Sequence, residues 1–231
     1  MIRIQLCKHS PLRTDSESWS KKNGYPGKTY GSRGFCIRHL SASMPASRIL
    51  TICKIEKSIK KTIQTLSTGM FIARKLNVVI SGKTGSGKSF LACDLGNNAC
   101  RQGYTVKYFR IPELLLEIQD AKNENRYTRF MDQMQKVKLL ILDDISLQSY
   151  PLEESRDILE VAERRYNKAS TILSGQIPHT QWYDLFPDPT LADGIMDRVI
   201  HNAYILALDS KISMREVMAE KIIKEINQTD S

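Results

Sequence analysis

The sequence has no long apolar run. The strongest is the four residues LLIL at 139–142. A helix that spans a bilayer needs about 20 predominantly apolar residues, so we expect neither a membrane span nor a membrane partner. Residues 1–20 also lack the apolar stretch of a secretory signal peptide, although a basic, amphipathic organelle-targeting leader stays open there. We therefore expect a cytoplasmic protein.

Paired cysteines and clustered histidines are also missing. The five cysteines form no C-x-x-C pair and have no histidine nearby at ligand spacing, and the four histidines are scattered. These absences argue against a disulfide framework and against a zinc site, and they favour a reducing compartment. Nothing resembles a Ser-His-Asp or Cys-His nucleophile. The cysteines are Cys7, Cys36, Cys53, Cys93 and Cys100.

Acidic residues are scarce at the beginning of the chain. The net charge is +9, and all of this excess lies in residues 1–60, which hold 12 basic and three acidic residues. The remainder carries 22 residues of each sign. A basic segment indicates an anionic partner such as DNA, and any such binding would weaken steeply with salt.

The N-terminal quarter differs in composition from the rest. Residues 1–48 are basic and predicted to be disordered or atypical, because residues 10–47 are rich in Ser, Gly and Pro without a helical or strand period. From 49 to 75, an apolar stripe predicts an amphipathic helix that ends near Gly69. Its Lys-rich outer face either meets DNA or is simply solvated. The stripe consists of Ile52, Ile55, Ile59, Ile63 and Leu66.

Five short β-rich runs then alternate with helical patterns. This alternation predicts an α/β fold with a five-stranded, mostly parallel sheet covered by helices on both faces. We expect the core domain to span residues 49–210 and a helical tail to follow at 211–231. The expected strands are residues 77–81, 105–110, 138–144, 170–175 and 203–208.

A glycine-rich motif lies between the first expected strand and a helical pattern. It satisfies G-x-x-x-x-G-K-[ST], in which backbone N–H groups and a helix N-terminus surround phosphate oxygens. Lys88 should neutralise the β- and γ-phosphates of ATP, and the Ser89 hydroxyl should ligate Mg²⁺. The alternative is a glycine-rich turn without a ligand. The candidate cofactor-binding residues are Gly82, Lys83, Thr84, Gly85, Ser86, Gly87, Lys88 and Ser89.

Two acids end the third expected strand, KLLILDD. A carboxylate at Asp143 would lie next to the phosphate loop and could hold Mg²⁺ through water. Asp144 is the nearest carboxylate that could orient or activate a water molecule for attack on the γ-phosphate. The alternative is a pair of ordinary surface acids that open a loop.

Two further polar positions are candidates. Ser174, with Gly175 and Gln176, ends the fourth strand, where a polar side chain could contact the γ-phosphate or its attacking water; a plain turn is the alternative. Arg198 lies at the border of the apolar stripe of a helix that starts in PDPT. It is either a packed, salt-bridged surface residue or an arginine finger that reaches a neighbouring subunit's γ-phosphate.

Together, VVISGKTGSGKSFLACDLGNNACRQGYTVKYFR, LLILDD, STILSGQIP and DPTLADGIMDRVIHNAYILAL resemble the IstB-like family of AAA+ ATPases, transposition helpers related to the helicase loader DnaC. The resemblance covers roughly residues 58–216. It implies ATP-dependent assembly of a homo-oligomer on double-stranded DNA, DNA remodelling, and delivery of target DNA to a partner transposase.

The resemblance also implies residue roles. Residues 82–89 would be the Walker A loop, and Asp143 with Asp144 the Walker B pair, with Asp at the second position as in IstB and DnaC relatives. Ser174 matches the sensor position. Arg198 matches the arginine of the DR motif, which acts across a subunit boundary. We do not expect Arg215 to be a second sensor.

Residues 1–48 depart from the family, whose members usually have an ordered helical N-terminal domain that helps to bind DNA or the partner. A truncated or shifted reading frame fused to an intact core is one hypothesis for this difference. Three alternatives to a transposition helper stay open: a DnaC-like helicase loader, a nucleotide-binding remnant of a mobile element without a productive partner, and a small-molecule kinase.

Overall fold

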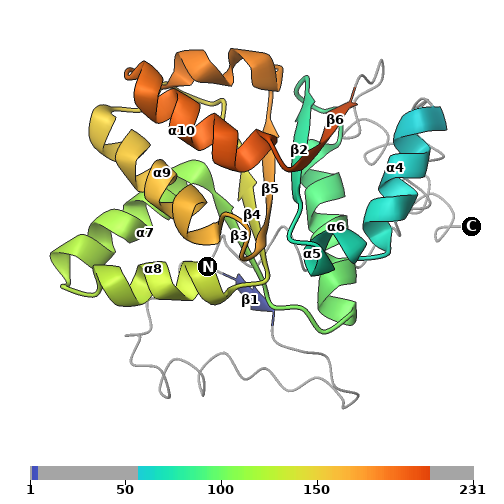
Figure 1. The fold of residues 1–231 in the computed structure, drawn as a ribbon, viewed down its shortest axis with the longest axis horizontal. Helices are drawn as coiled ribbons and strands as arrows, with labels where there is room; N and C mark the ends of the chain where they lie inside the picture. The colour runs from blue at the N-terminus through green and yellow to red at the C-terminus, as the bar shows by residue number, and fades with distance from the viewer. Residues whose placement is uncertain (1, 5–56, 209–231) are drawn as a thin grey trace, which may run out of the picture.

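A six-stranded sheet organises the computed structural model, which describes residues 2–4 and 57–208. The strand order is β1-β3-β4-β5-β2-β6, with β1 (Ile2–Ile4) antiparallel to β3 at one edge (Figure 1). The other five strands are parallel, and each matches an expected strand to within one residue at either end. They are β2 (Asn77–Gly82), β3 (Val106–Arg110), β4 (Leu139–Asp143), β5 (Ser170–Gly175) and β6 (Ala203–Leu208).

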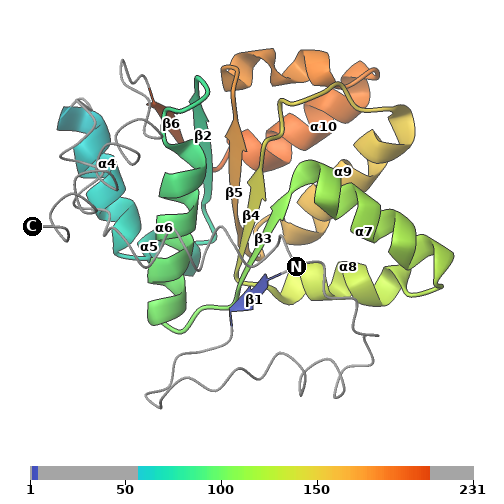
Figure 2. The ribbon, with the colours of Figure 1, turned by 180° about the vertical axis from the view of Figure 1, so that it is seen from behind.

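Helices cover both faces of the sheet, as predicted (Figures 1 and 2). One face carries α4 (Lys57–Ser67), α5 (Met70–Ala73) and α6 (Lys88–Arg101). The other carries α7 (Ile111–Asn123), α8 (Tyr127–Lys136), α9 (Leu152–Arg165), the 3₁₀ helix η1 (His179–Leu185) and α10 (Pro189–Ile200). Within the described part of the chain, none of these helices combines the length and apolarity needed to cross a bilayer.

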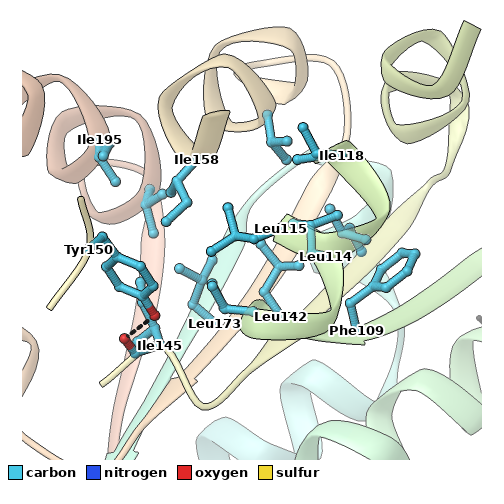
Figure 3. Packing of buried hydrophobic residues seen from close by; sticks show 14 of the residues in the cluster. Phe109, Leu114, Leu115, Ile118, Leu142, Ile145, Tyr150, Ile158, Leu173 and Ile195 are labelled. Atoms are coloured by element: carbon cyan, nitrogen blue, oxygen red, sulfur yellow. Dashed lines mark hydrogen bonds between the residues drawn. The ribbon is translucent and has the colours of Figure 1, made fainter. Parts of the chain in front are cut away.

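Strand β4 shows how the sheet divides the core into two hydrophobic clusters. Leu140 and Leu142 pack with α7 to α10, whereas Leu139 and Ile141 pack with α4 to α6. Side chains alternate between the two faces of a strand, and both faces are covered here. The strand is therefore a continuous apolar run. Figure 3 shows Leu142 among the buried side chains of the first cluster.

The amphipathic helix predicted for residues 49–75 corresponds, in its described part, to α4. Ile63 and Leu66 on its apolar stripe are each 1% exposed. The helix ends at Ser67, and Gly69 follows with a φ of 75°, a conformation that glycine adopts easily. Residues 49–56 of the predicted helix lie outside the described residues. So do the N-terminal segment apart from β1 and the C-terminal tail.

The carboxyl ends of the five parallel strands share one edge of the sheet, where ligands bind in open α/β folds. β2 ends at Gly82, β4 at Asp143 and β5 at Gly175. Because β5 lies between β4 and β2, the acidic pair is one strand away from the loop that follows β2. The end of β5 therefore lies between the acidic pair and this loop.

On the α7 to α10 side, a buried arginine joins three elements. Arg165 is 2% exposed, and its Nε donates to Thr171 Oγ1 at 2.9 Å. Its Nη1 donates to the carbonyls of Met134 and Val137 at the end of α8, and its Nη2 donates to the Ser170 carbonyl. Burial lowers the pKa of Arg165 to about 9, which leaves the side chain cationic at neutral pH.

We expect Arg165→Ala to lower the free energy of unfolding by about 3 kcal/mol or more, because four buried acceptors lose their donor. Urea unfolding followed by circular dichroism measures this loss. The matched control is Arg164→Ala: Arg164 pairs with Asp132 and Glu160 at the surface, so its loss should stay below about 1 kcal/mol. Equal losses for the two variants would contradict the assignment.

Candidate functional site

The loop between β2 and α6 presents polar groups inward. Gly87, at its end, has a φ of 93°, in the left-handed region that favours glycine. Gly82 is constrained differently, since a Cβ there would lie 2.3 Å from the Leu208 carbonyl oxygen. The Ser86 hydroxyl is buried without a hydrogen-bond partner among the described residues. Buried hydroxyls are usually paired, so this one is available to hydrogen-bond a ligand.

Lys88 is the first residue of α6, yet it is only 6% exposed. Its Nζ donates to the Lys83 carbonyl at 3.0 Å, across the loop. The positive end of the α6 dipole points toward the same place. A buried ammonium, a helix N-terminus and an unpaired hydroxyl together favour an anion, and the motif at residues 82–89 has the residue spacing of loops that bind nucleotide phosphates.

Asp143, at the end of β4, is 2% exposed and accepts three hydrogen bonds. Its Oδ1 accepts from the Ser174 hydroxyl and from the Asp144 N–H group, the latter at 3.0 Å. Its Oδ2 accepts from the Tyr108 hydroxyl at 2.8 Å. Ser174 is fully buried and turned toward Asp143. Tyr108 was not among the residues expected from the sequence.

Asp144 has a φ of 64°, a left-handed conformation that is uncommon outside glycine. Its Oδ2 accepts from Arg110 Nε and lies 2.9 Å from Arg110 Nη2. Partial burial alone would lower the pKa of Arg110, but the hydrogen bond and the charge of Asp144 raise it above its ordinary value. Arg110 was not among the residues expected from the sequence, although its place at the end of β3 puts it at the same edge.

The loop after β2 and the end of β5 are in direct contact. The Thr84 hydroxyl donates to Gln176 Oε1 at 2.9 Å. The backbone N–H group of Gln176 donates to Ser146 Oγ, in the loop that follows the acidic pair. Gln176, not Ser174, is therefore the polar residue at the end of β5 whose side chain reaches the loop.

Arg198 lies far from this edge in its own chain. The Asn77 side chain, at the start of β2, donates to the carbonyls of Arg198 and Val199 at 3.1 Å, which fixes the last turn of α10 at the opposite edge. A six-residue strand is about 20 Å long. Arg198 pairs with Glu163 at 2.8 Å and donates to the Gly194 carbonyl at 2.9 Å. The structure thus leaves Arg198 outside its own chain's candidate site.

The oxygen groups at this edge fit Mg²⁺ better than a softer metal. Within residues 57–208, no group of three or more His, Cys, Asp or Glu side chains could hold a metal ion by itself. Ser89 and Asp143 offer a hydroxyl and a carboxylate, which are the hard ligands that Mg²⁺ prefers, and Mg²⁺ commonly shares substrate phosphates and water. These residues fit a cation that arrives with a nucleotide.

Comparison with known proteins gives the chain a family. The family model of the IstB-like ATP binding protein matches residues 42–221. The insertion-sequence ATP-binding protein y4uH of Sinorhizobium fredii is 36% identical over 182 residues, which cover 78% of this chain and 73% of y4uH. Protein y4pL of the same organism is 41% identical over 135 residues, or 58% of this chain and 55% of y4pL. The chain thus spans little more than half of y4pL.

Solved structures agree with the fold. The DnaC helicase loader superposes with a TM-score of 0.58 at 16% identity, over 74% of this chain and 96% of that one. The replication initiator DnaA, bound to AMPPCP and single-stranded DNA, gives 0.55 at 20%, over 73% and 50%. At these identities the likeness shows a shared P-loop AAA+ fold. The family model covers well over half of the chain. The protein therefore belongs to the IstB-like ATP-binding protein family, as the motifs predicted.

Proposed function

We propose that this protein binds ATP with Mg²⁺ at the carboxyl edge of its sheet and hydrolyses it. The observation that carries the proposal is the loop at residues 82–89, which contains both the buried Lys88 and the unpaired Ser86 hydroxyl. These groups suit phosphate oxygens, and the oxygen ligands of Ser89 and Asp143 suit a hard cation.

Each residue has a proposed role. The loop holds the phosphates through its backbone N–H groups, Lys88 and the N-terminus of α6, while Ser89 and Asp143 hold the cation. Bound Mg²⁺ supplies neutralisation of the phosphate charge. Asp144 orients the attacking water and accepts its proton. Ser174 positions Asp143 through its hydrogen bond.

We further propose that hydrolysis needs a second copy of the chain. Arg198 lies at the amino edge of the sheet, about the length of a six-residue strand from the loop of its own chain. If it stabilises charge on a γ-phosphate, it must do so in a neighbouring subunit. The Glu163 pair would then have to open on assembly, and partly exposed pairs of this kind contribute little stability.

The biological role we propose is that of a helper in DNA transposition. The relatives are insertion-sequence ATP-binding proteins by name, and one structure with the same fold holds single-stranded DNA. The basic excess within residues 1–60 suits duplex DNA, so we propose assembly on double-stranded DNA and service to a partner transposase. In this proposal residues 1–48, 49–210 and 211–231 are the N-terminal segment, the ATPase domain and the tail.

Replacing Lys88 tests the nucleotide site. We expect Lys88→Ala to weaken ATP binding about 10- to 150-fold, because hydrogen bonds to charged groups contribute about 1.5–3 kcal/mol. Titration with a fluorescent ATP analogue measures this affinity. The matched control is Lys138→Ala, since Lys138 is an exposed lysine at the opposite edge of the sheet and should not affect binding. Unchanged affinity in Lys88→Ala would contradict the assignment of the loop.

The partner is tested by which macromolecule stimulates ATP turnover. We expect duplex DNA to stimulate ATP turnover. We also expect this protein, in the presence of ATP, to pull down the transposase of the same mobile element. Stimulation by a replicative helicase, without any effect of duplex DNA, would favour a helicase loader instead.

A further inference from the structure

Tyr108 reaches the candidate cation site from the middle of β3. The register pairs Tyr108 with Ile141 and Arg110 with Asp143, so Asp143 lies diagonally across from Tyr108. Diagonal neighbours on adjacent strands lie within reach of an aromatic side chain. The Tyr108 hydroxyl donates to Asp143 Oδ2 at 2.8 Å, and its ring packs against the cluster beneath α6.

Both side chains lie on the face of the sheet that α6 covers. Ile141 belongs to the α6 cluster, and Asp143, two residues later, projects to the same face. α6 crosses Ile141 closely, since a Cβ on Gly96 would lie 2.7 Å from Ile141 Cδ1. The same helix begins at Lys88, directly after the phosphate loop. The Tyr108 hydroxyl therefore lies on the face of the sheet that α6 covers, and α6 is the helix that directly follows the loop at residues 82–89.

The hydrogen bonds of Asp143 divide between its two oxygens. Oδ1 accepts from Ser174 and from the Asp144 backbone, whereas Oδ2 accepts from Tyr108. Each carboxylate oxygen has two lone pairs, so Oδ2 can accept the tyrosine and still face a metal-bound water. Hydrogen bonds to both oxygens therefore favour one orientation of the carboxylate.

We infer that Tyr108 is a positioning residue that orients Asp143 for the cation of the nucleotide. This inference rests on the proposed function, in which Asp143 serves Mg²⁺. Partners that orient metal-binding groups typically contribute 10- to 100-fold to metal affinity. The role is distinct from packing, because the ring fills the core with or without its hydroxyl.

The test is Tyr108→Phe in the full chain, which keeps the ring and removes the hydroxyl. The affinity for a fluorescent ATP analogue is measured across a Mg²⁺ titration and again in EDTA. We expect the Mg²⁺ midpoint to rise about tenfold or more, with binding in EDTA unchanged. The matched control is Tyr104→Phe: Tyr104 packs against the same cluster and lies two residues before β3 begins, so removing its hydroxyl should leave the Mg²⁺ midpoint unchanged.

Asp143→Asn separates failure of this inference from failure of the proposed function. If Asp143→Asn removes the Mg²⁺ dependence and Tyr108→Phe leaves it unchanged, the inference is wrong and the proposed cation site stands. If Asp143→Asn also leaves the dependence intact, the proposed cation site is wrong and the inference fails with it. If the Mg²⁺ midpoint rises equally in Tyr108→Phe and in Tyr104→Phe, the inference is also wrong, since a change in packing would explain both.

Discussion

Arg198→Ala is expected to abolish most ATP hydrolysis while leaving ATP binding intact. An arginine that stabilises transition-state charge contributes about 10³- to 10⁵-fold to phosphoryl transfer, so turnover should fall at least a thousandfold. Binding should persist because Arg198 lies at the amino edge of the sheet, away from the loop of its own chain. Steady-state hydrolysis and analogue titration, run side by side, measure the two effects.

Mixing two inactive variants tests whether Arg198 acts between subunits. Lys88→Ala lacks a working phosphate loop but keeps Arg198, and Arg198→Ala has the opposite defect. Mixed oligomers then contain sites built from an intact loop and a neighbour's arginine, so part of the activity should return. Glu163→Ala is the matched control: it breaks the same ion pair without removing the arginine and should retain activity. No recovery on mixing, together with loss of activity in Glu163→Ala, would show that Arg198 is a structural residue.

Asp144→Asn is expected to reduce hydrolysis about 10²- to 10⁴-fold, the usual contribution of a positioned general base. The amide keeps the size of the side chain but cannot accept a proton at neutral pH. ATP affinity should change little, because Asp143 and the loop are untouched. Single-turnover hydrolysis with the protein in excess measures the chemical step directly. Near-normal turnover would contradict the role of Asp144.

The effect of Arg110→Ala on turnover is to be compared with that of Asp144→Asn, because Arg110 is the ion-pair partner of Asp144. The pair is partly exposed, with the Arg110 side chain 48% accessible, so removing the arginine should shift turnover by less than tenfold. An effect as large as that of Asp144→Asn would mean that the ion pair, and not the free carboxylate, is what hydrolysis requires. The two variants together therefore distinguish chemistry at Asp144 from its placement by Arg110.

Local patterns predicted the five parallel strands and the position of the loop between β2 and α6, but not the edge strand β1. The run at 139–142 is apolar because β4 is buried on both faces, and such a run is recognisable without knowing its neighbours. Residues 82–89 are equally local, since a motif of eight residues places the glycines, Lys88 and the start of α6. These features depend on near neighbours in the chain, so the sequence alone predicted them to within a residue or two.

The contacts around the acidic pair could not be predicted in the same way. Tyr108 and Arg110 meet Asp143 and Asp144 from 35 and 34 residues away, and only the register of β3 against β4 brings them together. The bond of Ser174 to Asp143 likewise follows from the order of the strands, which places β5 between β4 and β2, whereas its expected contact with the γ-phosphate stays a prediction.

Arg165 lies on the buried stripe of α9, but its charge made it look like a surface residue in the sequence. It follows Ile158 and Val161 at helical spacing, so it continues the apolar stripe of α9. An arginine on that stripe normally indicates its edge, and the adjacent Arg164 is indeed near the surface. The acceptors that allow Arg165 to be buried come from α8 and β5, which the stripe alone does not reveal.

Assembly of an active ATPase on DNA is tested by measuring ATP turnover with and without duplex DNA, at low and at moderate salt. We expect duplex DNA to stimulate hydrolysis by the intact chain, the stimulation to weaken as salt rises, and Lys88→Ala to abolish it. Turnover that is equal with and without DNA, or that persists in Lys88→Ala, would show that the protein is not a DNA-assembled ATPase.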